Sequence, residues 1–234
     1  MSQFPATRIS LVAGLHSDQT AVRERAMELV ARAYREPIVT VLQHQWSLAR
    51  ADAEDLAHDF FEQALSKHWL ERFDPERGRF RTFLRSCLFA YASTAHEAQT
   101  RLKRGGGTRQ VSLDDVDLHT TVAPEVESLF DREWTRAVLE LSMDALQQEC
   151  QREGKEPALA VFIARDVQGA EQSSPPSYQE LADRFDVPPT QVTNYLNWAR
   201  RRFRHHVLET LRALTGTDDE FRAEARSLLG VDLT

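Results

Sequence analysis

The chain has 234 residues, of which 41% are hydrophobic and 28% are charged, a composition typical of a globular protein rather than a disordered or fibrous one. Its formal net charge at pH 7 is −7, so a polyanion could be bound only by a locally basic surface. No run approaches the roughly 18 apolar residues of a membrane span, and the first residues, MSQFPATRIS, lack the apolar core of a signal peptide. We therefore expect a cytoplasmic protein with no membrane contact.

The chain contains two cysteines, Cys87 and Cys150, and both fall within helical apolar patterns. This placement predicts buried free thiols rather than a disulfide or a cysteine-rich zinc site. Four other potential metal ligands occur close together in sequence, but helical spacing does not gather them on one face; they are His58, Asp59, Glu62 and His68. We therefore expect no metal and no cofactor.

Charged residues are segregated along the chain. Between Arg72 and Arg109, nine Lys or Arg residues stand against three acidic ones, whereas residues 114–133 hold seven acidic residues and one Arg. The last segment, from residue 217 onwards, is also acidic. Separate nucleic-acid-binding and protein-binding surfaces are therefore compatible with the negative total.

Two helices are predicted in the first part of the chain. Apolar residues recur at helical spacing from Thr20 to Trp46, and Pro37 is expected to kink or divide that helix. A second helix is expected from Asp52, in DAEDLAHDFFEQAL, with a core stripe of Ala53, Leu56, Ala57, Phe60 and Ala64. Its nearly opposite face carries four carboxylates, Asp52, Asp55, Asp59 and Glu62. Their mutual repulsion would be relieved by a basic protein partner, although a merely solvated acidic face is the alternative.

A third helix is predicted after a turn at Asp74-Pro75 and Gly78. Its apolar face comprises Phe80, Phe83, Leu84, Cys87, Leu88 and Tyr91. Basic residues outside that face, interleaved with aromatic ones, suit a surface that holds phosphates and stacks unpaired bases. Phe89, which lies off the main stripe, and Tyr91 are the better candidates for base contact, whereas the other aromatics are expected to be core.

Residues 105–128 have the composition of a linker, and a helix is expected to resume at about Leu129. That helix should end near Gly154 and Pro157, and a short apolar helix should follow over residues 158–164. No stretch shows a convincing strand pattern. The sequence therefore predicts an all-α protein with two helical domains joined by a linker.

The stretch SYQELADRFDVPPTQVTNYLNWARRRFRHHV predicts two helices joined by a tight turn. Ser177 and Glu180 have the spacing of a capping box, Asp186 tolerates a left-handed turn, and Pro189 suits the first position of a helix. The second helix buries a stripe of Val192, Leu196, Ala199 and Phe203. Its opposite face presents hydroxyl, amide and guanidinium groups without a carboxylate. A helix with such a face fits the major groove of DNA. The alternative interpretation is a basic helix face that is merely solvated.

A final helix, DDEFRAEARSLLG, is expected after an interruption at residues 215–217. One hypothesis is that its carboxylates compete with DNA for Arg200, Arg201 and Arg204. The alternative is a surface helix that only completes the core through Phe221, Leu228 and Leu229.

Together, and in this order, these blocks resemble a sigma factor of bacterial RNA polymerase, of the compact extracytoplasmic-function type in the sigma-70 family. DAEDLAHDFFEQAL resembles the family's core-binding helix, FRTFLRSCLFAYA its promoter-melting helix, and the helix-turn-helix its reader of the upstream promoter box. The resemblance covers most of residues 10–212. It implies a region-two-like domain at 1–104, a linker at 105–128, a region-four-like domain at 129–214 and an extra acidic extension at 215–234.

The resemblance also implies partners and roles. The chain would bind core polymerase at the clamp helices of its largest subunit and at its flap. The residues implied for this contact are Asp52, Glu54, Asp55, Asp59 and Glu62. Promoter DNA near the minus-ten box would be held or melted by Arg79, Arg81, Arg85, Phe89, Tyr91, Thr94, His96, Arg101, Lys103 and Arg104. The minus-thirty-five box would be read or positioned by Thr190, Gln191, Thr193, Asn194, Asn197, Arg200, Arg201 and Arg204. The resemblance implies no catalysis by these residues, and an anti-sigma protein is a further candidate partner.

Two other functions stay open. A helix-turn-helix regulator that binds an operator as a dimer would explain the C-terminal half, but it leaves the acidic face at Asp52–Glu62 without a role. A sigma-like decoy would bind polymerase without melting DNA, and the unusual AYASTAHEA sequence after the melting helix favours it. An enzyme is the weakest alternative, because no nucleophile–base pair, phosphate loop or metal spacing occurs.

Overall fold

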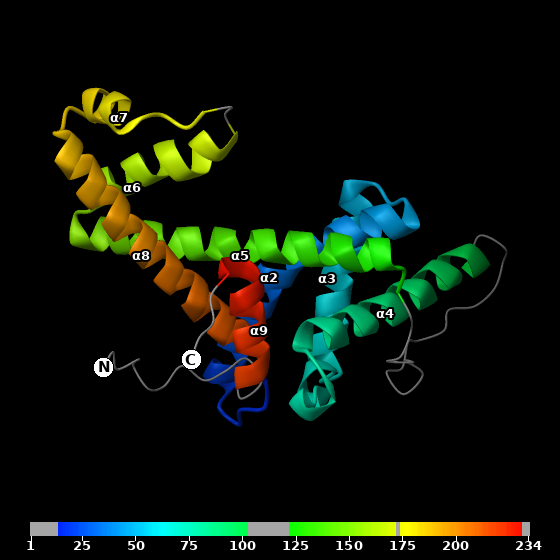
Figure 1. The fold of residues 1–234 in the computed structure, drawn as a ribbon. Coiled ribbons are helices and arrows are strands. Elements are labelled where there is room, and N and C mark those ends of the chain that lie inside the picture. The colour runs from blue at the N-terminus through cyan, green and yellow to red at the C-terminus, as the bar shows by residue number, and fades with distance from the viewer. Residues whose placement is uncertain (1–13, 103–121, 172–173, 231–234) are drawn as a thin grey trace. The chain divides into compact units, whose positions relative to one another are not determined.

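The computed structural model describes residues 14–102, 122–171 and 174–230, and within them the chain forms helices and connections with no strand (Figure 1). The prediction of an all-α protein is confirmed. None of the described helices has the length and apolarity needed to cross a bilayer. The α-helices are α2 (Thr20–Trp46), α3 (Arg50–Ser66), α4 (Phe80–Leu102), α5 (Pro124–Glu153), α6 (Glu156–Phe162), α7 (Tyr178–Phe185), α8 (Pro189–Leu214) and α9 (Asp218–Leu229). Short turns of 3-10 helix, at Leu70–Arg72, Pro75–Arg77 and Gln168–Glu171, and one π-helical turn, at Ile163–Val167, accompany them.

The chain divides into two compact units. Unit 1 combines residues 1–137 with residues 211–234, and unit 2 comprises residues 138–210. Helices α5 and α8 therefore each contribute one part to unit 1 and one part to unit 2. These boundaries follow packing and differ from those of the domains expected from the resemblance, because the start of α5 and all of α9 belong with α2–α4.

One proline and one helix boundary bear on the sequence-based expectation. Pro37, expected to kink or divide its helix, does not divide α2, which is one helix from Thr20 to Trp46 with Ala33, Tyr34, Ile38 and Val39 buried near the proline. That burial offsets the backbone hydrogen bond that a proline cannot make. Helix α5 begins at Pro124 rather than Leu129, because proline suits a first helical position and Glu125 and Glu127 suit the positive end of the helix dipole.

Unit 1 has a core rich in aromatic side chains. Tyr34 of α2 packs against Phe80 of α4, with 5.8 Å between ring centroids, and against Phe130 of α5, at 6.2 Å. Phe60 of α3 packs against Trp69 and against Tyr91 of α4, at 6.3 Å and 5.7 Å. Edge, tilted and stacked contacts of this kind add to the apolar area that the rings bury. Phe130, which was expected in the second domain, is therefore part of the unit 1 core.

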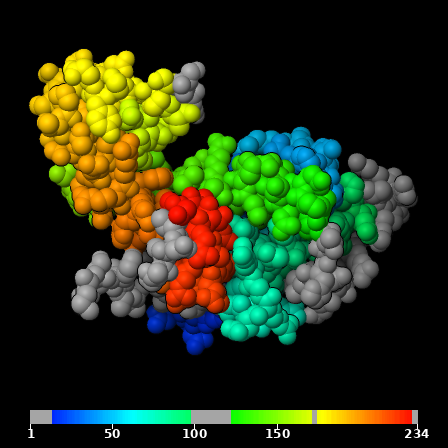
Figure 2. Space-filling view, in the orientation of Figure 1, coloured from blue at the N-terminus to red at the C-terminus, as the bar shows by residue number. Residues whose placement is uncertain are grey.

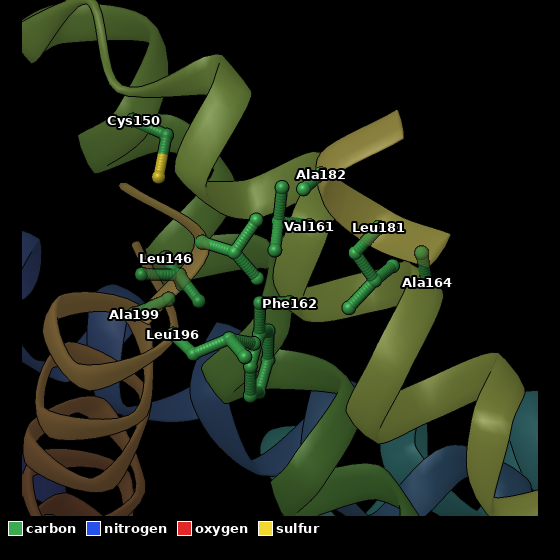
Figure 3. Close-up of a cluster of buried hydrophobic side chains, with 10 residues drawn as sticks. Leu146, Cys150, Val161, Phe162, Ala164, Leu181, Ala182, Leu196 and Ala199 are labelled. Atoms are coloured by element: carbon green, nitrogen blue, oxygen red, sulfur yellow. The ribbon is translucent and has the colours of Figure 1, made fainter. Parts of the chain in front are cut away.

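Unit 2 has its own apolar core, which joins α5, α6, α7 and α8 (Figure 3). It contains Leu146, Cys150, Val161, Phe162, Ala164, Leu181, Ala182, Val192, Leu196 and Ala199. Three members of the stripe predicted for α8, namely Val192, Leu196 and Ala199, are fully buried there. The helix-turn-helix therefore packs against α5 and α6 through this core.

We expect both cysteine thiols to be inert in the folded protein. Both are free and buried, as the sequence predicted, and burial raises the pKa of Cys87 to about 12 and that of Cys150 to about 11. At pH 8, only about one Cys87 side chain in ten thousand is then in the reactive thiolate form. The measurement is labelling with a disulfide reagent at pH 8, with and without denaturant. Labelling of the folded chain as fast as that of the unfolded chain would contradict this expectation.

Candidate nucleic-acid and polymerase interfaces

The acidic face of α3 is exposed and lines a pocket. Asp52, Asp55 and Asp59 are exposed and border a pocket of about 280 Å³. The rest of its lining is Trp46, Leu48, Leu56, Ala92, Ala95 and His96. Within residues 14–102, 122–171 and 174–230, these three aspartates and Glu62 form no ion pair. Carboxylates without an ion pair, beside the apolar side chains of the same lining, suit a basic side chain with an aliphatic stem.

The other two acidic residues predicted for polymerase binding differ from one another. Glu62 is exposed, and it lies near enough to Tyr91 to act on the phenol. Burial, with smaller contributions from the charges of Asp59 and Glu62, raises the pKa of Tyr91 to about 12. The carboxylate of Glu54, by contrast, accepts a hydrogen bond from Nε of Arg50 at 2.9 Å. Glu54 is therefore not part of the uncompensated face.

Three arginines near the start of α4 are all paired with carboxylates of unit 1. Nη1 of Arg79 lies 3.2 Å from Oε1 of Glu224, and Nη2 of Arg81 lies 3.1 Å from the same oxygen. Arg81 also pairs with Asp131 of α5 at 3.1 Å. Arg85 pairs with Glu127 of α5. These three predicted phosphate ligands are therefore engaged within the protein.

Arg81 and Arg85 are also more buried than the sequence suggested. The side chain of Arg85 is 7% exposed and that of Arg81 is 12% exposed, whereas that of Arg79 is 50% exposed. The guanidinium of Arg81 stacks on Trp134, 4.3 Å from the ring centroid. Placing Arg81 and Arg85 outside the buried face was wrong, because the start of α5 covers the side of α4 that carries them.

The two aromatic residues selected for base contact are in the core. Phe89 is 7% exposed and packs on Trp46, with 5.3 Å between ring centroids. Tyr91 is 9% exposed and packs on Phe60 and Trp69. The expectation that Phe89 lies off the buried face was wrong, because α2 and α3 together cover a wider sector of α4 than one helix would. Tyr91 was assigned to the apolar face, and it is buried there. A base could reach either ring only if that ring left the core.

The remaining candidates on or after α4 fall in different places. The hydroxyl of Thr94 donates to the carbonyl of Ala90 at 2.9 Å, and His96 lies at the acidic pocket of α3. For Arg101 the structure gives only its position in α4, and Lys103 and Arg104 lie outside the described residues. His96 is thus grouped with the predicted polymerase-binding residues rather than with the arginines.

The helix-turn-helix forms by the local signals that the sequence contains. The amide of Glu180 donates to Oγ of Ser177 at 3.2 Å, and the amide of Ser177 donates to the Glu180 carboxylate at 2.6 Å, which completes the capping box. Asp186 has a left-handed conformation, with φ 51° and ψ 50°, and α8 begins at Pro189. The turn between α7 and α8 can be followed in Figure 1. These three predictions are confirmed.

The predicted reading face of α8 is largely available. Its exposed members are Thr190, Asn194, Asn197, Arg200, Arg201 and Arg204, and its half-buried members are Gln191 and Thr193. No ion pair of Arg201 or Arg204 occurs within the described part of the chain. Arg200 is different, since it donates two hydrogen bonds to Asp166, at 2.6 and 2.7 Å. The hydroxyl of Thr193 donates to the carbonyl of Pro189 at 3.2 Å.

A groove beside this face adds a basic residue that sequence reasoning missed. It has a volume of about 660 Å³ and is lined by Lys155, Ala158, Gln191, Asn194, Tyr195, Asn197, Trp198 and Arg201. Lys155 precedes α6 and is far from α8 in sequence, so helical periodicity could not reveal it. The groove combines cationic, amide and aromatic groups, which are the groups that nucleic-acid surfaces use.

Arg202, on another side of α8, has a structural role. It pairs with Glu149 of α5, a buried carboxylate that also lies 2.6 Å from Nε2 of His206. Burial alone would raise the pKa of Glu149, but the hydrogen bonds from Arg202 and His206 outweigh it and lower the pKa. Because this pKa is lowered, the interactions of Glu149 with Arg202 and His206 stabilise unit 2 at pH values above the usual carboxyl pKa. That contribution is lost as the pH falls through the lowered pKa of Glu149.

Helix α9 buries carboxylates rather than mainly apolar residues. Its buried residues are Glu220, Glu224 and Ala225, whereas Phe221, Leu228 and Leu229 are half-buried. Glu224 pairs with arginines of unit 1, which neither expectation for this segment included. These arginines, near the start of α4, compensate a charge that is otherwise unfavourable on a buried face. Competition for Arg200, Arg201 and Arg204 stays a prediction.

Comparisons with known proteins identify no family for this chain: no protein-family model matches it, and neither a curated protein nor a solved structure matches it.

Proposed function

We propose that this chain is a sigma factor of the extracytoplasmic-function type, which binds core RNA polymerase and directs it to promoters. In this proposal unit 1 docks on the clamp helices of the largest polymerase subunit through Asp52, Asp55, Asp59 and Glu62, and unit 2 binds the minus-thirty-five box through α8. The chain itself catalyses nothing and acts in the cytoplasm with polymerase. Its binding energy would favour the melted promoter over the closed duplex.

The observation that carries the proposal is the uncompensated acidic face of α3. A helix-turn-helix alone would equally suit a dimeric regulator. Asp52, Asp55 and Asp59, however, border one pocket and form no ion pair among the described residues, and their mutual repulsion opposes the folding of the isolated protein. A basic helical partner would convert that repulsion into attraction, and a DNA-only regulator has no such partner.

The direct test mixes the purified chain with core RNA polymerase and follows both by gel filtration. Co-elution as one complex supports the proposal. Binding to DNA together with no polymerase complex would replace it with the dimeric regulator.

A second candidate has a specific observation in its favour. Phe89 and Tyr91 are buried, and Arg79, Arg81 and Arg85 are all paired, so these five of the residues expected to hold or melt promoter DNA are occupied within the protein. A sigma-like decoy would bind polymerase in this form without opening DNA. Run-off transcription from duplexes selected by the complex separates the two, because only a sigma factor yields transcripts.

We expect Asn194→Ala and Arg201→Ala each to weaken DNA binding by about 1–3 kcal/mol, the usual cost of losing a specific base contact. Both residues are exposed and line the groove beside α8. The measurement is fluorescence anisotropy with a duplex selected from a random pool by the chain in complex with polymerase. Arg152→Ala, an exposed arginine of α5 in the same unit, is the matched control. Equal losses for all three variants would indicate general electrostatics and contradict a reading face on α8.

A further inference from the structure

Helix α9 has an unusual buried face. Two of its three buried residues are the carboxylates Glu220 and Glu224, with exposed fractions of 9% and 7%. Burying a carboxylate is unfavourable unless a cation or hydrogen-bond donors compensate it. The packing of α9 against unit 1 is therefore governed by the partners of these two side chains.

The two carboxylates have different partners. Glu220 accepts a hydrogen bond from the amide of Gly216 at 2.8 Å, and its own amide donates to the hydroxyl of Thr217 at 3.1 Å, so it helps to begin its own helix. Glu224 instead accepts from Nη1 of Arg79 at 3.2 Å and from Nη2 of Arg81 at 3.1 Å. Glu224 is thus the residue whose ion pairs join α9 to the start of α4, where Glu220 also interacts with the backbone of Phe80 and with the charge of Arg79.

The apolar contribution to this contact is limited. Phe221, Leu228 and Leu229 are only half-buried, and the ring of Phe221 is covered by Arg212 of α8, which belongs to the same unit. Figure 2 shows α9 at the molecular surface, lying against the start of α4. A segment held by few buried apolar contacts separates more readily than a core helix.

The arginines that Glu224 engages are two of those proposed to hold promoter phosphates. A guanidinium binds carboxylate and phosphate oxygens with the same planar set of donors, so the two anions compete. We propose that α9 is an intramolecular competitor of nucleic-acid phosphates for Arg79 and Arg81, and that it must separate from α4 before these arginines bind DNA. This inference rests on the proposed function, because it regulates the DNA-binding surface which that function requires.

The geometry also says which arginine is released most completely. After α9 separates, Arg81 still has Asp131 and Trp134 of α5 as partners, and Arg85 still has Glu127. Arg79, whose side chain is half exposed, has no second ion pair within the described residues. Arg79 is therefore the main phosphate ligand that α9 withholds.

The test neutralises Glu224 in the full chain and measures the binding of fluorescein-labelled oligothymidylate. Glu224→Gln should bind roughly 3- to 10-fold more tightly at low salt, and the logarithm of its affinity should fall more steeply with the logarithm of salt concentration, by about 0.7 for each phosphate gained. Asp219→Asn is the matched control, because Asp219 is an exposed residue of the same helix that pairs only with the neighbouring Arg222 among the described residues. Equal affinity and slope for the two variants would overturn the inference.

A second substitution assigns the gain to Arg79. Arg79→Gln should change the affinity little in the wild-type chain, but it should remove the gain when combined with Glu224→Gln. A gain that survives in the double variant would overturn the assignment.

Hydrogen exchange of the wild-type chain provides a test that needs no substitution. Amides of α9 should exchange faster when saturating oligothymidylate is present, and unchanged protection would overturn the inference. Failure of the proposed function gives a different pattern. A gain for Glu224→Gln without a polymerase complex supports the competition and contradicts the sigma factor, whereas a polymerase complex without that gain contradicts only the competition.

Discussion

Reversing the charges of Asp55 and Asp59 to arginine should weaken the complex with core polymerase by at least about 100-fold. Both side chains are exposed, one helical turn apart, on the face of α3 that borders the pocket. Since neither has an ion-pair partner among the described residues, the substitution breaks no ion pair within that part of the chain. It replaces attraction to a basic partner with repulsion and should leave the folded chain intact.

The control for this prediction lies on α2. Glu24 and Glu28 are also exposed and also separated by four residues, so Glu24→Arg with Glu28→Arg makes the same change in charge elsewhere in unit 1. Gel filtration with core polymerase should show a complex for this control and none for the α3 variant. Loss of both complexes would indicate an effect of total charge, and survival of both would remove α3 from the docking surface.

Phe80→Ala should lower the free energy of unfolding by about 3–5 kcal/mol, the usual cost of truncating a buried aromatic residue. Its ring is fully buried and lies 5.8 Å from that of Tyr34 and 5.2 Å from that of Phe73, measured between centroids. Removing it leaves a cavity where α2, α4 and the turn before α4 meet.

Urea denaturation followed by tryptophan fluorescence measures this loss, because Trp46, Trp69 and Trp134 all belong to unit 1. Phe83→Ala, on the same helix but only half-buried, should cost clearly less. A loss below about 1 kcal/mol for Phe80→Ala would mean that unit 1 does not depend on this packing.

The features predicted well from the sequence depend on neighbours in the chain. The bounds of α2 follow from helical periodicity, and the capping box at Ser177 and the left-handed turn at Asp186 depend on residues within three positions. The stripe of Val192, Leu196 and Ala199 is a periodic signal within a single helix, and all three residues are buried as expected. Local signals of this kind need no knowledge of tertiary structure.

The features that the sequence did not reveal depend on distant partners. Arg85 is buried because Glu127, 42 residues later, approaches it, and Arg79 meets Glu224 across 145 residues. Helical periodicity predicts that an arginine lies on the exposed side of its helix. Its burial becomes energetically acceptable only when a second element brings a carboxylate to compensate its charge. The burial of Phe89 has a similar origin, because Trp46, from the end of α2, covers its ring. The roles of all these residues in promoter binding stay predictions.

The division of unit 1 into two stretches of sequence has a consequence for its synthesis on the ribosome. All of unit 2, residues 138–210, is translated between the two parts of unit 1, so the last part of unit 1 emerges after the whole of unit 2. A nascent chain that has reached only α8 has Arg79 in place but not yet Glu224. If the chain folds as it emerges, from the N-terminal side onwards, Arg79 is open to cellular polyanions until translation reaches α9. The order of translation therefore gives each newly made molecule an interval in which Arg79 is uncovered.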